Sequence, residues 1–437
     1  MRKITRHPLY ATADALKRAF AAQGFTLEDD GADPELQTAD WAFNPFYKPG
    51  GLRHVPILLE DHGEYALRNE LVNRQLGAWR GRIPLRTICV GRIYDAADAP
   101  LADHLVLAGA IIDEDVEKRH LERLWFGIAA HLYGLGARAA LEPIERDTFR
   151  VAVQAASESF TLAHIGRASE IARALLGLDD PSLPAWIFEV DIDAVAMHDF
   201  EIPDRASLYS PLASFLSQFE NDEPACGQSF ESKAIDTLRS HGYLEFSSAR
   251  LYEQDCYEKM NMIMESWDLN NRGFFLKDPL GGKVRVPTVR TPALEDALEG
   301  NYKAGAESAR LFEIGQHFVS DAQGRNPVLK SSISVGAYGP GIDKASFRRE
   351  VDSIMSDLGI SNHFFIPIDM AIPYDPTDCW ILMDEHMKYL GGNFGTINQI
   401  ALDRHGLGVK AYMLQIEIEP LRKKAEEEFD FSPAELS

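Results

Sequence analysis

The sequence predicts an α+β protein made of two similar halves, each with an antiparallel or mixed sheet flanked by helices. One observation is that the order helix, extended segments, helix, strand pair, helix, strand occurs twice along the 437 residues. Another is that strands such as 187–192 alternate apolar and acidic residues, which suits an antiparallel sheet with one face in solvent. We expect the halves at 1–203 and 228–437, with a connector at 204–227.

Residues that correspond between the two halves keep a nearly constant spacing of 222 to 226 positions. This regularity over several elements favours an internal duplication, although any α+β chain offers some correspondences by eye. The corresponding pairs are Arg68 with Arg290, Gly91 with Gly315, Gly136 with Gly359, and Asp191 with Glu417.

The helices are predicted from apolar residues at helical spacing that are followed by a glycine. In residues 10–24, Leu16 and Phe20 fall on one face, and Gly24 ends the helix. Residues 231–242 repeat this plan in the second half, and further helices are expected at 212–219, at 344–358 and after 421. The strand segments, as corresponding pairs, are 84–98 with 309–323, 104–112 with 332–339, and 186–195 with 412–421.

The composition is that of a soluble globular protein, with 45% apolar and 25% charged residues. The formal net charge of −23 repels phosphate backbones and argues against a nucleic-acid partner. Four cysteines without a CxxC spacing predict free thiols in a reducing compartment. We see no signal peptide and no apolar run long enough to cross a bilayer, so we expect a cytoplasmic protein with no membrane contact.

The most informative stretch is RTPALEDALEGNYKAGAESARLFEIGQHFVSD at 290–321. Its apolar spacing predicts a helix of about three turns that Gly305 ends, followed by a strand over 309–315. With these residue types, the stretch resembles the β chain of bacterial phenylalanyl-tRNA synthetase. Segments 7–9 and 41–54 of the first half look closer to the α chain of that enzyme. The resemblance implies two class II aminoacyl-tRNA synthetase cores, packed as an intrachain pseudo-dimer.

Amino-acid activation requires cationic side chains against the phosphates of ATP, and arginine serves this purpose best. The resemblance implies such arginines in motifs 2 and 3 of an active enzyme. In this sequence the expected positions hold Asp95 in the first half and Val319 and Ala411 in the second. We therefore identify no catalytic residue, and we expect ATP and magnesium only if the chain is an active ligase after all.

Five residues are candidates for binding a ligand: Arg68, Arg92, Arg290, Glu313 and Lys410. Arg68 and Arg290 begin corresponding helices and can hold a carboxylate ligand or form ion pairs within the fold. For Glu313 we favour a structural role, in which it bonds a neighbouring backbone group or an arginine. We expect no metal site, and we interpret residues 384–386 (Asp-Glu-His) as an acidic helix face with a surface histidine.

The leading hypothesis is a phenylalanyl-tRNA-synthetase-like pseudoenzyme that does not aminoacylate and binds a small amino acid-like ligand or a protein partner. The alternative is an active, ATP-dependent amino-acid-activating ligase. A third hypothesis is a scaffold or subunit that associates through the old dimerisation surface, and a homo-oligomer is compatible with it. We expect no tRNA binding, because the chain is strongly acidic and segments resembling the tRNA-binding arms of the family are not seen.

Overall fold

The structure is a computed structural model, and it divides the chain into two compact units. The N-terminal unit comprises Pro8–Leu208 with Leu276–Gly282, and the C-terminal unit comprises Met1–His7, Tyr209–Phe275 and Lys283–Ser437. Each unit is described by itself. The described residues are 6–28, 36–38, 57–59, 65–95, 103–155, 158–219, 229–248, 251–253, 256–259, 276–277, 284–285, 288–320, 327–369 and 373–429.

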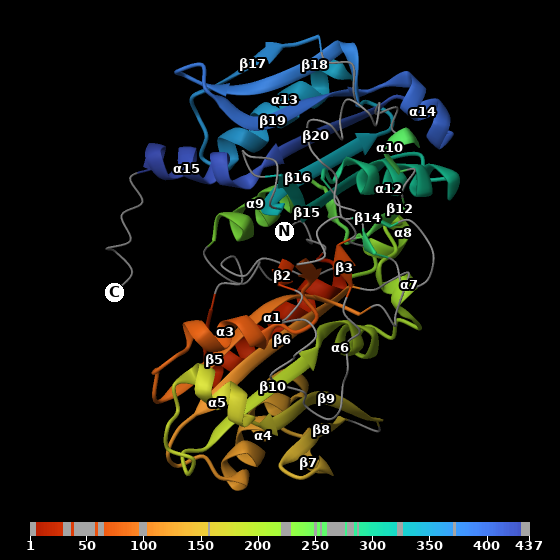
Figure 1. The fold of residues 1–437 in the computed structure, drawn as a ribbon. Helices are drawn as coiled ribbons and strands as arrows, with labels where there is room; N and C mark the ends of the chain where they lie inside the picture. The colour runs from red at the N-terminus through yellow and green to blue at the C-terminus, as the bar shows by residue number, and fades with distance from the viewer. Residues whose placement is uncertain are drawn as a thin grey trace. The chain divides into compact units, whose positions relative to one another are not determined.

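The N-terminal unit is built on a seven-stranded sheet in the order β1-β5-β6-β10-β9-β8-β7 (Figure 1). In this sheet β1 and β5 run parallel, and the other neighbouring pairs are antiparallel. The elements are α1 (Pro8–Ala22), β1 (Thr26–Leu27), α3 (Val72–Ala78), β5 (Leu85–Tyr94), β6 (Asp103–Ile112), α4 (Lys118–Tyr133), β7 (Arg138–Glu145), β8 (Thr148–Ala155), β9 (Glu158–Arg167), α5 (Glu170–Leu176), β10 (Ala185–Asp191), α6 (Ile192–Asp199) and α7 (Arg205–Leu208). A small second sheet, in the order β13-β3-β4-β2, contains β2 (Leu36–Thr38), β3 (Leu58–Leu59), β4 (Tyr65–Leu67) and β13 (Leu276–Lys277).

The C-terminal unit has a seven-stranded sheet in the order β11-β15-β16-β20-β19-β18-β17, and β12 pairs with β14. Again the two-residue edge strand, β11, is parallel to its neighbour, and the other pairs are antiparallel. The elements are α8 (Ala213–Leu216), α9 (Phe230–Ser240), β11 (Leu244–Glu245), β12 (Tyr252–Glu253), α10 (Cys256–Lys259), β14 (Val284–Arg285), α12 (Thr291–Lys303), β15 (Ala309–Ser320), β16 (Pro327–Tyr338), α13 (Lys344–Asp357), β17 (His363–Pro367), β18 (Tyr374–Asp384), β19 (Tyr389–Ile397), α14 (Gln399–His405), β20 (Ala411–Glu417) and α15 (Ile418–Phe429).

The two large sheets have the same topology, strand for strand, and the same register in their centres. Ile112 of β6 lies between Leu85 of β5 and Ala185 of β10. In the C-terminal unit, Tyr338 of β16 lies between Ala309 and Ala411 in the same way. The spacing between equivalent residues is therefore 224 between β5 and β15, and 226 between β6 and β16 and between β10 and β20. The α+β prediction of one antiparallel or mixed sheet per half is confirmed.

Both faces of the large sheets carry helices, so the expectation of a solvated face is wrong. Every residue of β6 is buried. In the N-terminal unit, α3 and α5 pack on one face with Leu76 and Leu176 in their core, and α1 and α4 cover the other. On that second face, Phe20 stacks on Phe188 with ring centroids 5.2 Å apart, and Trp125 meets both rings edge-on.

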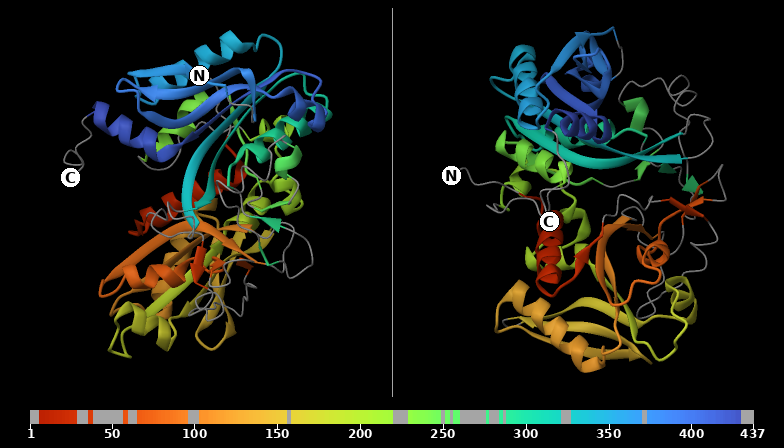
Figure 2. Two further views of the ribbon diagram at one scale, coloured as in Figure 1. Left: turned by 45° about the horizontal axis from the view of Figure 1, so that its top comes forward. Right: turned by 90° about the vertical axis from the view of Figure 1, so that its left-hand side faces the viewer.

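The C-terminal sheet is covered in the equivalent way. Helices α9, α13 and α15 share one apolar cluster with the sheet, and α12 and α14 share another. The two views of Figure 2 show α13 and α15, in shades of blue, lying along the blue strands of this sheet. The acidic residues of strands such as β10 therefore do not mark a solvated face; Asp191 caps the next helix by accepting a hydrogen bond from the Ala194 N–H.

The predicted helices after residues 10, 231, 290 and 344 are confirmed, with ends that follow from local chemistry. The glycines at 24, 242 and 305 have φ between +80° and +84°, a conformation that favours glycine. At the end of α4 the residue with positive φ is Gly134 rather than Gly136. No helix among the described residues is long and apolar enough to cross a membrane. Residues 220–228 of the predicted connector lie outside the described residues, and the predicted limits of the halves stay predictions.

Candidate ligand-binding residues and the histidine cluster

Arg92 in the N-terminal unit forms a buried ion pair. Its Nη1 lies 2.5 Å from Oδ2 of Asp103, and the two side chains are 3% and 1% exposed. Arg68 donates from Nε to the carbonyl oxygen of Arg92 at 2.8 Å and is itself buried. Asp95, at an expected arginine position, is buried just beyond the end of β5. The structure thus places Arg68, Arg92 and Asp95 near one end of β5. The positive charge of Arg92 is compensated by Asp103.

Arg290 in the C-terminal unit also faces a carboxylate. Its Nη2 lies 2.6 Å from Oε2 of Glu313, and both side chains are almost fully buried. Glu313 accepts two further kinds of hydrogen bond, from the backbone N–H of Ser248 at 2.8 Å and from its hydroxyl at 2.9 Å. The Arg290 guanidinium also lies 5.5 Å from the ring centroid of Tyr252. Two predicted ligand-binding residues are therefore brought together, and they bind each other.

The remaining predicted positions do not join this group. Val319 is half-buried on β15, and Ala411 is fully buried at the start of β20. Lys410 is exposed in the turn between α14 and β20. Of the α-chain-like segments, 41–54 lies outside the described residues.

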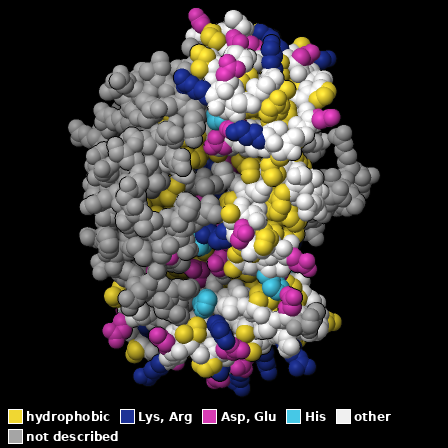
Figure 3. Space-filling model, turned by 90° about the vertical axis from the view of Figure 1, so that its right-hand side faces the viewer, with side chains coloured by type: hydrophobic (Ala, Val, Ile, Leu, Met, Phe, Trp, Pro, Cys, Tyr) yellow, Lys and Arg dark blue, Asp and Glu magenta, His cyan; other side chains and the backbone are white. Residues whose placement is uncertain are grey.

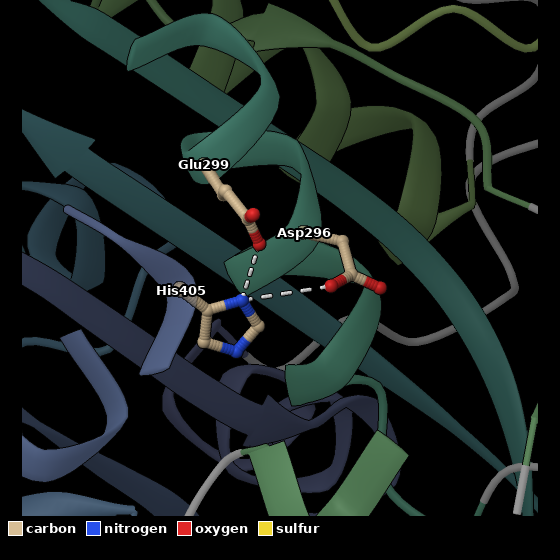
Figure 4. Close-up of side chains that lie close together, drawn as sticks. All are labelled: Asp296, Glu299 and His405. Atoms are coloured by element: carbon tan, nitrogen blue, oxygen red, sulfur yellow. Dashed lines mark hydrogen bonds and ion pairs between the residues drawn. The ribbon is translucent and has the colours of Figure 1, made fainter. Parts of the chain in front are cut away.

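A cluster that the sequence did not reveal lies between α12 and α14. His405, the last residue of α14, is 2% exposed, and its Nδ1 is 2.6 Å from Oε2 of Glu299 and 3.7 Å from Oδ1 of Asp296 (Figure 4). Its Nε2 is 3.1 Å from Oε2 of Glu295. The three acidic residues share one side of α12 because positions three and four apart are neighbours on a helix. Gly406, with φ +69°, turns the chain directly after the histidine. We call these four residues the histidine cluster.

The charged groups of the histidine cluster shift one another's pKa values. Burial opposes the charged form of His405, but the carboxylates of Glu295 and Glu299 outweigh it and raise the pKa of the imidazole to about 9. Burial also raises the pKa of Glu295. Lys303 contacts the second oxygen of Glu299. The cluster can hold either a proton or a metal ion at Nδ1 of His405, since imidazole and carboxylate are ligands of divalent metals.

Sequence analysis missed this cluster because its partners are over one hundred positions apart. Only the acidic run on the predicted helix at 291–303 gave a local signal. Residues 384–386, interpreted as an acidic helix face, instead lie at the end of β18 and in the following turn. Their carboxylates are engaged: Lys424 binds both oxygens of Glu385 at 2.7 Å, and Asp384 accepts from the Lys388 N–H at 2.7 Å.

The surface charge of the described residues is mixed. On the face that Figure 3 shows, lysine and arginine side chains are interspersed with aspartate and glutamate side chains.

Part of the chain is similar to proteins of one synthetase family. Residues 218–418 match the family model described as the phenylalanyl tRNA synthetase beta chain CLM domain. The phenylalanine–tRNA ligase beta subunit of Clostridium tetani is 24% identical over 217 residues, which are 49% of this chain and 27% of that subunit. The alpha subunit of Bacillus pumilus phenylalanine–tRNA ligase is 20% identical over 241 residues, covering 50% of this chain and 69% of that subunit.

Among solved structures, a pyrrolysyl tRNA synthetase of Desulfitobacterium hafniense aligns with 14% identity and a TM-score of 0.37, covering 45% of this chain and 68% of that one. The chain spans about a quarter of the Clostridium tetani beta subunit. The resemblance carried by residues 290–321 is confirmed by the family model that includes them. Residues 218–418 of the chain are similar to the β chain of phenylalanyl-tRNA synthetase, and about half of the chain is similar to subunits of phenylalanine–tRNA ligase.

Proposed function

We propose that this chain is a non-aminoacylating relative of phenylalanyl-tRNA synthetase that binds a small amino acid-like ligand or a protein partner. The observation that carries the proposal is the state of its candidate arginines. Arg92 and Arg290 are each buried against a carboxylate of the same unit, at 2.5 Å and 2.6 Å. A guanidinium committed in this way is not available for a triphosphate without breaking an ion pair in the protein interior.

The three positions where the resemblance implies phosphate-binding arginines support the same conclusion. Asp95 carries the wrong charge for a phosphate, and Val319 and Ala411 carry none. Electrostatic stabilisation of the transferring group is the largest contribution that such an active site makes. The proposed ancestry of the two units is a duplication, for which their shared strand order and register are the argument.

The test is ATP–pyrophosphate exchange with each of the twenty amino acids, with an active phenylalanyl-tRNA synthetase as positive control. We expect no exchange above the protein-free background. Robust exchange with any amino acid would overturn the proposal and establish the active ligase instead.

A second measurement addresses the ligand. Isothermal titration with phenylalanine, and with phenylalaninol as a matched compound without the carboxylate, tests for an amino acid site. Binding of phenylalanine that phenylalaninol does not show supports a carboxylate-recognising pocket in a protein without exchange activity. If neither compound binds, the small-ligand part of the proposal is wrong for phenylalanine, and the protein-partner part is then tested by co-purification with a tagged chain.

A further inference from the structure

The histidine of the cluster stands at a helix end where the other unit has a leucine. Helix α5 ends at Leu176 before Gly177, whose φ is +71°, and α14 ends at His405 before Gly406, whose φ is +69°. Leu176 is 1% exposed and belongs to the apolar core shared by α3 and α5. Because a leucine satisfies the packing at this helix end, the fold itself does not require a histidine surrounded by three carboxylates.

We propose that Asp296, Glu299 and His405 bind a divalent transition-metal ion, for which Zn²⁺ is the probe. Nδ1 of His405 and one oxygen of each carboxylate all lie within 4.8 Å of one another (Figure 4). Asp296 and Glu299 are three positions apart on α12, so their side chains project from the same side of the helix. Imidazole with two carboxylates is a ligand set that suits zinc and related ions.

The second observation concerns Glu295, which lies behind the histidine. Its side chain is 1% exposed, and its carboxylate faces the imidazole of His405. Oε2 is 3.1 Å from Nε2 of His405, the ring nitrogen that does not face Asp296 and Glu299. In metal sites the ring nitrogen that does not bind the ion usually donates to a carboxylate, which fixes the tautomer. Glu295 is placed to act as that positioning residue.

The exposure of the three ligands gives an ion a way in. The side chain of Asp296 is 61% exposed and that of Glu299 is 20% exposed, whereas His405 is 2% exposed. An ion bound here therefore has protein ligands on its inner side and solvent on the other, which leaves room for water as a further ligand. It would join the end of α14 to the middle of α12.

The experiment uses the full chain after treatment with EDTA and desalting. Zn²⁺ is titrated by calorimetry, and Co²⁺ binding is followed by its visible absorption. We expect a single equivalent of Zn²⁺ and a rise in the thermal unfolding temperature that grows with free Zn²⁺. His405→Leu, which copies the residue of the other unit, should abolish this binding. Glu295→Gln should retain the stoichiometry and weaken the affinity about 10- to 100-fold.

A matched control is His386→Ala, which removes an exposed histidine that also has two acidic neighbours. This variant should bind Zn²⁺ like the wild-type chain. Three results would overturn the proposal: no binding by the wild type, binding that survives in folded His405→Leu, or binding lost only in His386→Ala. If His405→Leu does not fold by circular dichroism, Glu299→Gln takes its place, because that side chain is partly exposed and its loss disturbs the core less.

Discussion

The two units differ in the side chain at the end of equivalent helices, which is a leucine in α5 and a histidine in α14. Both helix pairs share apolar residues: Leu76 of α3 and Leu176 of α5 lie in one cluster, and α12 and α14 share another. Between α12 and α14 of the C-terminal unit, His405 is held among acidic residues of α12. The sheets beneath share strand order and register, so the backbone plan does not account for the difference. Because the fold accepts either a leucine or a histidine at this helix end, function can change at this position.

The two units also place a glycine on opposite faces of the equivalent strand. By register, Gly109 of β6 corresponds to Val335 of β16, whereas Gly336 corresponds to Ala110. Gly109 makes room for Phe188 and the aromatic cluster on the face of α1 and α4. Gly336 makes room for Leu294 of α12 on the other face. In each unit a glycine therefore makes room for a large apolar side chain, but on opposite faces of the two sheets.

We expect the largest effect from breaking the buried ion pair between Arg290 and Glu313 in the C-terminal unit. The N-terminal unit has no carboxylate at the position equivalent to Glu313. Arg290→Ala leaves Glu313 buried without its counter-charge and should cost about 3–5 kcal/mol in the free energy of unfolding. By register the residue equivalent to Glu313 is Cys89, so the double variant Arg290→Met/Glu313→Cys should recover most of the loss. Urea unfolding measures both. Lys423→Ala, in an exposed pair with Glu419, is the control and should change stability by less than about 0.5 kcal/mol.

Adding a methyl group at the two glycines sharpens the comparison of the cores. A Cβ on Gly109 would lie 2.4 Å from the carbonyl oxygen of Thr87, and backbone cannot yield easily. Gly109→Ala should therefore cost about 2–3 kcal/mol. A Cβ on Gly336 would meet the end of the Leu294 side chain at 2.8 Å, which can move. Gly336→Ala should cost less than about 1 kcal/mol, and equal costs in thermal unfolding would contradict this reading of the two faces.

Replacing His405 by leucine, the residue at the equivalent helix end of the N-terminal unit, tests whether an apolar side chain can take its place. In metal-free protein, His405→Leu leaves Glu295 buried beside an apolar side chain and should cost about 1–3 kcal/mol. The double variant His405→Leu/Glu295→Leu should regain most of that stability, because an apolar pair can replace a buried charged one. A double-mutant cycle by urea unfolding gives the coupling between them. Additive losses would mean that the contact depends on its charges.

The smallest effect concerns the helix cap that starts α13. Asp343 caps α13 by accepting a hydrogen bond from the Ser346 N–H at 2.7 Å, and this bond lowers the pKa of its carboxyl. A lowered pKa in the folded state means that Asp343 contributes stability above its unfolded pKa and loses it as the pH falls through the folded value. Asp343→Asn keeps an acceptor but does not titrate. Its unfolding free energy should therefore fall less steeply between pH 5 and pH 2 than that of the wild type, a range chosen to bracket the ordinary carboxyl pKa.

Local signals in the sequence predicted much of the fold. Glycines that end helices, such as Gly24 and Gly242, act through their own backbone conformation and can be read directly. The spacings that linked Gly91 with Gly315 and Asp191 with Glu417 agree with the strand registers. The solvated face was predicted wrongly because acidic residues at strand ends served as helix caps rather than as surface.

The candidate site was less accessible to sequence reasoning. Arg92 and Arg290 were predicted to bind a ligand, and their partners Asp103 and Glu313 became evident only from strand pairing and helix placement. The histidine cluster depends on a contact between residues about 110 positions apart, for which His405 and Glu295 carry no common local pattern. Buried charge networks of this kind are set by tertiary structure.

Each large sheet begins, at one margin, with a strand of only two residues, β1 or β11. An edge strand of two residues exposes few unpaired backbone N–H and C=O groups, so a strand of another molecule would form few hydrogen bonds with it. The opposite margins are longer: β7 has eight residues and β17 has five. By this measure β7 and β17 are the edges of the two sheets that offer a neighbouring strand more backbone groups to pair with.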